Sequence, residues 1–272
     1  MIDDTYLTGK VHVDKHPFVE HFKFVKALED EKTVAKQTIP APAQFLEQMI
    51  MPFAIENTRK YYENTDELVE DIAKGYQKVI ADLYEAGCRN IQLDDCSWGM
   101  LVDPRACMLF GTDEAGLEKI KEQLLNINNR AIEGKPDDLV INTHVCRGNF
   151  HSTYASSGAY DSVAKTLFAK ENVSAYYLEF DDERSGGFES LSEVSENKKV
   201  VLGLITTKSP VLEDKGKVIA RIREAAKYVP LERLYLSPQC GFASCEIGNK
   251  LTEEEQWAKL KLVKEIAEEV WG

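Results

Sequence analysis

The sequence predicts an α/β fold built from parallel strands and the helices that cover them. Short apolar, β-branched segments alternate with longer amphipathic segments along the 272 residues, which is the pattern of repeated strand–helix–strand units. No break in composition, linker or low-complexity segment interrupts the alternation. Polar and ionisable residues follow several of the apolar segments. We therefore expect one domain over residues 1–272, with 1–33 as an irregular or helical lead-in.

Six segments are predicted to be strands, and most are followed by a predicted helix. Thr65 is expected to cap the helix that starts at Asp66, and Thr252 with Glu255 predicts a capping box. The strands are expected at 34–40, 90–95, 139–145, 175–180, 199–205 and 233–237. The helices are expected at 17–28, 44–49, 66–86, 114–132, 161–169, 213–228 and 252–271.

The order of these elements favours a barrel over an open sheet. An open doubly wound sheet places its ligand at one switch point, whereas a β/α barrel uses the carboxyl ends of many strands. Here several successive strands each end in chemically capable side chains. We expect a TIM-type (β/α)8 barrel, although six strands are found where such a barrel has eight.

Composition and charge exclude several classes of partner. The net charge of −13 and the absence of a basic stripe argue against nucleic acid and anionic membrane surfaces. No apolar run is long enough to span a bilayer, and no signal peptide is predicted. A cytoplasmic protein is expected, in which the six cysteines are thiols, metal ligands or catalytic groups rather than disulfides.

The segment from Leu139 to Gly148 carries the clearest chemical signal. Its apolar start predicts a buried strand, and it ends in His144 and Cys146, which project to the same side because they lie two residues apart. Glu179 and Cys240 follow two later strands. Two thiolates, an imidazole and a carboxylate form a credible tetrahedral zinc set, with Zn²⁺ as the expected cofactor. The alternatives are a structural zinc staple, or unrelated packing residues.

The mixed ligand set predicts chemistry at a thiol. The carboxylate is the harder and weaker ligand, so an incoming thiol can displace it, and coordination removes the thiol proton. Because thiolates attack alkyl groups, we expect alkyl transfer to sulfur. Asp94 and Asp95, which end another strand, are candidate substrate contacts. Lys208 follows the strand at 199–205, and His151 lies in the loop beside the site as a further candidate contact.

Three motifs resemble the catalytic barrel of the cobalamin-independent methionine synthases, and their short relatives most of all. They are Thr143-His144-Val145-Cys146, Tyr177-Leu178-Glu179 and Ser237-Pro238-Gln239-Cys240-Gly241-Phe242, and Gln92-Leu93-Asp94-Asp95 corresponds to a fourth family segment. The resemblance runs from about Val34 to the C-terminus. It implies zinc held by His144, Cys146, Glu179 and Cys240, with Asp94 on the amino group of homocysteine and a methyl donor as second substrate.

Two departures from the family pattern affect these expectations. Lys208 stands where the family has a histidine that is thought to donate a proton, and lysine has an ordinary pKa of about 10.4, well above that of histidine. The methyl donor is therefore left open. The G-S-F/Y-P segment of the family's first strand and the acidic D/H-G-E segment of its second are also missing, so the resemblance predicts a barrel without its first two βα units.

Two functional hypotheses follow from the sequence. The first is a zinc-dependent methyltransferase acting on a small thiol, homocysteine above all. The second is a catalytically silent, truncated paralogue or fragment that keeps a structural zinc within a larger assembly. The complete ligand set favours the first, and the missing strands favour the second. The missing strands also predict exposed sheet edges, and with them self-association or pairing with an upstream partner segment.

Overall fold

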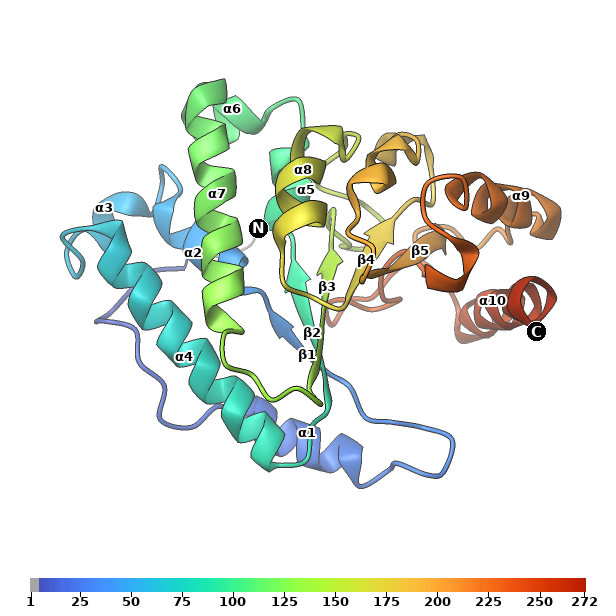
Figure 1. The fold of residues 1–272 in the computed structure, drawn as a ribbon, viewed down its shortest axis with the longest axis horizontal. Coiled ribbons are helices and arrows are strands. Elements are labelled where there is room, and N and C mark those ends of the chain that lie inside the picture. Colours follow the sequence, from blue (N-terminus) through green and yellow to red (C-terminus); the bar gives the residue numbers. More distant parts are fainter. Residues whose placement is uncertain (1–4) are drawn as a thin grey trace. The chain divides into compact units, whose positions relative to one another are not determined.

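The computed structural model describes residues 5–272 and shows an α/β fold with a parallel six-stranded sheet (Figure 1). The strand order is β1-β2-β3-β4-β5-β6, so strands adjacent in the sequence are also neighbours in the sheet. All six strands predicted from the sequence are confirmed. Their bounds are β1 Gln37–Pro40, β2 Asn90–Asp95, β3 Val140–Val145, β4 Ala175–Glu179, β5 Lys199–Ile205 and β6 Leu234–Pro238.

The seven predicted helices are also confirmed, with shifts of a few residues at their ends. No helix within residues 5–272 has both the length and the apolar character needed to cross a membrane. The helices are α1 Phe18–Lys26, α2 Pro42–Ile50, α3 Ile55–Thr58, α4 Thr65–Glu85, α5 Ser97–Leu101, α6 Ala106–Leu109, α7 Glu114–Ala131, α8 Asp161–Lys170, α9 Lys215–Ala225 and α10 Glu253–Trp271, with short 3₁₀ turns at Glu183–Ser185, Glu189–Glu193 and Leu231–Arg233.

The chain divides into two compact units, and each is described by itself. Unit 1 contains the residues up to Ser97 together with 105–143 and 171–173, and unit 2 contains 98–104, 144–170 and 174–272. The predictions of a single domain, of a closed barrel and of missing βα units stay predictions.

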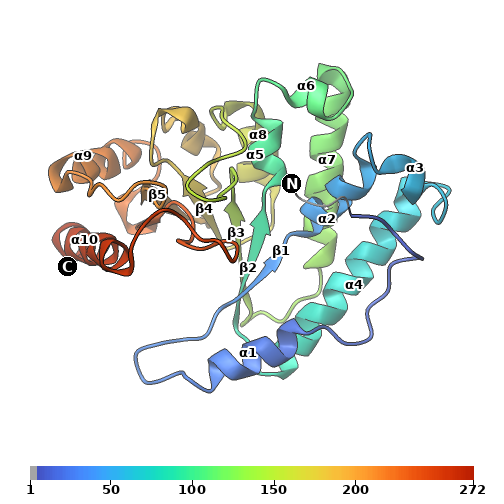
Figure 2. The ribbon, with the colours of Figure 1, turned by 180° about the vertical axis from the view of Figure 1, so that it is seen from behind.

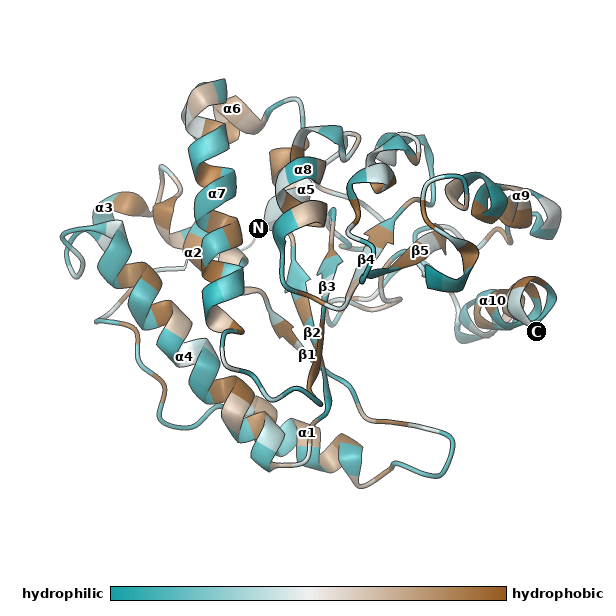
Figure 3. Cartoon of the chain, in the orientation of Figure 1, coloured by the Kyte–Doolittle hydropathy of each residue, from teal (hydrophilic) through white to brown (hydrophobic). Residues whose placement is uncertain are grey.

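Unit 1 is built on helices α2, α4 and α7, which pack against one another. Figures 1 and 2 show α4 and α7 side by side, with α1 near one end of α4. Apolar residues recur every three or four positions along α4 (Figure 3). Leu68, Ile72 and Leu83 are among them, and these three are buried. The N-terminal cap of α4 is Asn64, whose side chain accepts the Glu67 N–H, and not the predicted Thr65.

Unit 2 holds β4, β5 and β6, with α9 and α10 in mutual contact. Every residue of β5 after Lys199 is buried, as expected of a strand covered on both faces. Gly203 lies in this strand, close to Gln239, the first residue after β6. A Cβ at this position would lie 2.7 Å from the Gln239 Cα and 2.8 Å from the Leu178 carbonyl oxygen. The predicted capping box of Thr252 and Glu255 begins α10.

Candidate metal centre

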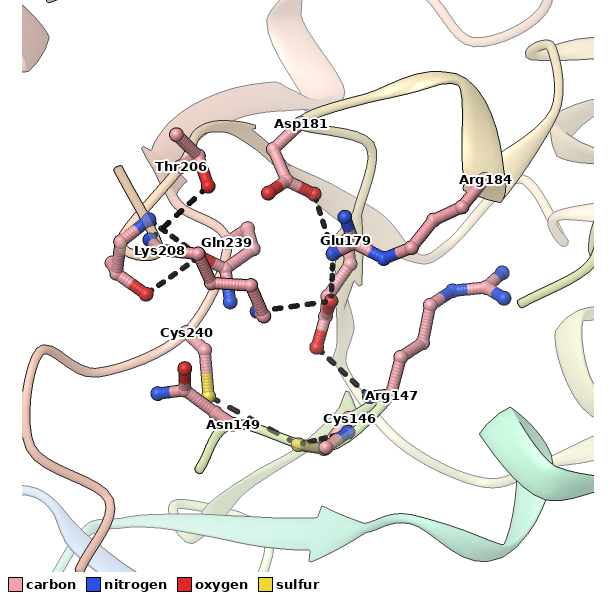
Figure 4. Close-up of polar contacts among 12 residues, drawn as sticks. Cys146, Arg147, Asn149, Glu179, Asp181, Arg184, Thr206, Lys208, Gln239 and Cys240 are labelled. Atoms are coloured by element: carbon pink, nitrogen blue, oxygen red, sulfur yellow. Dashed lines mark hydrogen bonds and ion pairs between the residues drawn. The ribbon is translucent and has the colours of Figure 1, made fainter. Parts of the chain in front are cut away.

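The four predicted ligands come together in unit 2. One donor atom from each of His144, Cys146, Glu179 and Cys240 lies within 4.8 Å of the other three. The residues are carried by the ends of three strands, β3, β4 and β6, and the first three are buried. Figure 4 shows the two sulfur atoms facing each other below the Glu179 carboxylate. The sequence therefore predicted a set that the fold brings together.

His144 and Cys146 are positioned by the backbone at the end of β3. The His144 Nδ1 lies 3.2 Å from the Tyr177 carbonyl oxygen. A hydrogen bond there requires the Nδ1–H tautomer, in which Nε2 carries the ring's lone pair for a metal. The Cys146 Sγ accepts the Gly148 N–H at 3.4 Å. Gly148 has a φ of 88°, which turns the chain sharply after the ligand.

Cys240 lies on the loop that follows β6, with its Sγ 4.0 Å from that of Cys146. The pKa of Cys240 is lowered, first by the hydrogen bond with Cys146 and then by hydrogen bonding to and the charge of His144. A lowered thiol pKa favours the thiolate, which is the form that binds metal. The close approach of Gln239 to Gly203 fixes where this loop starts.

Glu179 is fully buried and surrounded by donors. Its Oε1 accepts the Arg147 backbone N–H at 2.8 Å, and its Oε2 accepts an Arg184 Nη2 hydrogen at 2.7 Å. The Lys208 Nζ lies 4.0 Å from the same Oε2. Burial raises the pKa of Glu179, while the charges of Lys208 and His144 act in the opposite direction. The carboxylate is therefore shared between a candidate metal and two cations.

Two further donors near the centre are buried. The side chain of Lys208 is 9% exposed, and its Nζ makes no hydrogen bond within residues 5–272. Gln239 is also buried: its Oε1 accepts from the Thr207 N–H and hydroxyl, whereas its Nε2 has no partner in the part of the chain that is described. Lys208 was predicted from the sequence. Gln239 was missed, although it lies directly beside a predicted ligand.

The remaining predicted site residues have the following surroundings. Asp94 and Asp95 end β2 in unit 1. Asp94 is half-buried, whereas Asp95 is buried and accepts hydrogen bonds from the Ser97 N–H at 3.1 Å and the Asn128 side chain at 2.9 Å. His151, in unit 2, has a left-handed φ of 46°, and its Nδ1 lies 3.4 Å from the Gly248 carbonyl oxygen. Substrate roles for these three residues stay predictions.

The donor set fits zinc better than a harder cation. Two cysteines and a histidine supply sulfur and nitrogen, which calcium and magnesium rarely accept. Four donors also match the usual coordination number of zinc. The three strand ends are therefore a suitable frame for a zinc ion with one carboxylate ligand.

Comparison with known proteins points to one family. Residues 49–269 match the family described as "Cobalamin-independent synthase, Catalytic domain". The chain is 42% identical to each of two uncharacterized proteins of Bacillus subtilis, YxjG and YxjH, over 97% of this chain and 69% of theirs. It is 24% identical to a methionine synthase of Pyrococcus horikoshii, over 88% of this chain and 60% of that protein.

Solved structures agree with these sequence matches. A Listeria monocytogenes protein proposed to be a vitamin-B12-independent methionine synthase is similar with a TM-score of 0.74 and 37% identity, over 96% of this chain and 71% of that one. A B12-independent methionine synthase of Shewanella, solved with selenomethionine, has a TM-score of 0.69 and 22% identity, over 94% and 67% of the two chains. The second likeness shows a shared fold.

Proposed function

This chain belongs to the family of cobalamin-independent synthase catalytic domains, and on that premise we propose that it is a methyltransferase that methylates the thiol of homocysteine. The observation that carries the proposal is the group of His144, Cys146, Glu179 and Cys240, whose donor atoms lie within 4.8 Å of one another. In the reaction a sulfur–carbon bond forms and the bond from the methyl carbon to its donor breaks. The thiol proton is released before attack, and the donor leaves with the bonding electron pair.

The four residues would hold a zinc ion. When bound, zinc supplies a positive centre that keeps a substrate thiol deprotonated at neutral pH. The two cysteines and His144 would hold the metal firmly. Glu179 is the ligand that we expect to yield to the substrate sulfur, because a carboxylate is the weakest of the four donors for zinc.

Other side chains would orient the substrates. Lys208 and Gln239 offer buried donors without a hydrogen-bond partner among the described residues. A hydrogen bond from such a donor to a substrate acceptor would stabilise the complex. We assign them to an anionic group of the methyl donor or to the homocysteine carboxylate. Asp94 is proposed to contact the amino group, with Asp95 and His151 as further substrate contacts. The Asp94→Asn variant should then bind homocysteine more weakly, because the charge-assisted hydrogen bond is lost.

X-ray absorption at the zinc edge tests the proposal. The purified protein should contain one zinc with two sulfur ligands, and saturating homocysteine should add a third. Cys146→Ser and Cys240→Ser should each lower zinc content, whereas Cys107→Ser, outside the group, should not. An unchanged first shell at saturating homocysteine would reject the mechanism and support the structural zinc of the second hypothesis. Full zinc occupancy in both ligand variants would reject the ligand set.

A further inference from the structure

Arg184 forms ion pairs with three carboxylates: Glu179 at the end of β4, and Asp181 and Asp182 in the loop that follows. Its Nη2 lies 2.7 Å from the Glu179 Oε2 and 2.8 Å from the Asp181 Oδ1, and its Nη1 pairs with Asp182. The Arg184 side chain is 5% exposed, and those of Glu179 and Asp181 have no exposed surface. Because water does not screen these buried charges, the electrostatic attraction between Arg184 and the Glu179 and Asp181 carboxylates is strong.

The guanidinium is held in place without help from Glu179. Asp182 caps the short 3₁₀ turn of Glu183–Ser185 by accepting the Arg184 N–H at 2.9 Å, and it also pairs with the Arg184 side chain. The guanidinium carbon lies 4.8 Å from the centre of the Tyr154 ring. Arg184 is therefore a fixed cation beside the candidate metal ligand, and not a side chain that Glu179 has attracted.

This arrangement limits what Glu179 can donate to a metal. Its Oε1 already accepts the Arg147 N–H, and its Oε2 faces Arg184, with Lys208 on the other side (Figure 4). Each cation draws electron density from the carboxylate and weakens its bond to zinc. Each also lowers the cost of leaving the carboxylate buried once it has left the metal, because an unpaired buried charge is strongly unfavourable.

We propose that Arg184 is the positioning residue that makes Glu179 an exchangeable ligand, by holding the carboxylate after the substrate sulfur displaces it. The inference rests on the proposed function, since it needs a thiol that enters the metal's coordination shell. Arg184 touches neither substrate nor metal in this scheme. Asp181 and Asp182 act through it by fixing the guanidinium.

The test compares Arg184→Gln and Arg184→Lys with the wild type, and uses Arg59→Gln, an exposed arginine of unit 1, as control. Without the guanidinium, Glu179 should bind zinc more firmly. Zinc transfer to a chelator should then slow by about 10-fold, and the homocysteine concentration needed for half-maximal gain of sulfur in the absorption spectrum should rise by about 10-fold. Arg184→Lys should recover part of both effects, and Arg59→Gln should match the wild type.

Several outcomes would overturn the inference. Faster zinc loss in Arg184→Gln would mean that Arg184 holds Glu179 on the metal rather than receiving it. Wild-type behaviour in both measurements would mean that Arg184 has no influence on exchange. Should Arg184→Gln not fold, the double variant Arg184→Gln/Asp181→Asn removes one buried charge of each sign and carries the same expectation. If the wild type itself gains no sulfur, the proposed function fails and this inference with it, whereas a wild-type gain matched in every Arg184 variant defeats the inference alone.

Discussion

Glu47 is a buried carboxyl group of unit 1 that lies outside the metal centre. It is 3% exposed on α2. Burial raises its pKa from 4.5 to about 7, and the nearby Asp95 carboxylate acts in the same direction. Between these two pH values the folded chain holds a proton that the unfolded chain has released. The free energy of unfolding must therefore fall as pH rises from about 4.5 to about 7, because the folded state binds more protons there.

The Glu47→Gln variant should lose this pH dependence. The amide is nearly isosteric and carries no charge, so its burial costs the same at every pH. We expect the variant to gain about 1–3 kcal/mol in the free energy of unfolding relative to the wild type between pH 5 and pH 8. Urea unfolding at the two pH values measures it, with the exposed Glu63→Gln as control. A constant difference between Glu47→Gln and wild type would contradict the prediction.

At the residue scale, the sequence predicts ligands better than it predicts their neighbours. His144 and Cys146 form a local pattern on one strand, and Glu179 and Cys240 follow strands whose ends meet in a parallel sheet. Arg184 and Gln239 have no such pattern. Arg184 lies in the loop segment Asp181-Asp182-Glu183-Arg184, where a cation among acidic residues is ordinarily a solvated one. Only the fold of the loop shows that this guanidinium is buried against Glu179.

At the scale of elements, two asparagines join the loops that surround Cys240. The Asn249 amide donates to the Asn149 Oδ1 at 2.9 Å and to the Thr207 carbonyl at 2.8 Å. The Asn149 amide donates to the Gly241 carbonyl and the Ser244 hydroxyl, both at 2.7 Å. These bonds link the loops after β3, β5 and β6, which carry Cys146, Lys208 and Cys240.

Removing this link should loosen the metal centre without unfolding unit 2. In Asn149→Ala the loop after β6 loses three hydrogen bonds, two of them next to Cys240. Zinc should therefore transfer to a chelator about 10-fold faster, the lower end of the usual range for lost supporting contacts. Zinc transfer and circular dichroism should be measured together, with Asn126→Ala, an exposed residue of α7, as control. Equal transfer rates in the two variants would show that the link does not support the ligand.

The accuracy of the predicted helix boundaries depended on the length of the periodic apolar pattern in each helix. Long periodic segments such as α4, α7 and α10 were predicted within a few residues. The cap of α4 was placed one residue late because Asn64 and Thr65 are both good capping residues, and only the side-chain geometry distinguishes them. The four- and five-residue helices α3, α5 and α6 were missed because about one turn gives too little periodicity.

At the scale of the whole molecule, the parallel α/β fold followed from the alternation of elements, because each strand–helix–strand unit forms a parallel pair. The order β1 to β6 leaves β1 paired with β2 alone within residues 5–272. Its exposed residue Thr38 lies on that edge strand. An unpaired strand edge is a template for another chain, although β1 is short and ends in Pro40, both of which weaken the template.

The methyl donor and the sheet edge can be examined in one preparation. Methylfolate leaves as a nitrogen anion that needs a proton, and at neutral pH lysine is ordinarily a poorer proton donor than the histidine that the family has in place of Lys208. We expect little methionine formation from methylfolate and homocysteine by the wild type, and more by Lys208→His. Because of the unpaired edge of β1, we also expect light scattering to give a mass above the 30.7 kDa of one chain. Thr38→Lys should lower that mass, because a charged edge residue opposes strand pairing. Robust turnover by a wild-type monomer would contradict both expectations, and would mean that a fixed cation serves this donor as well as a proton source does.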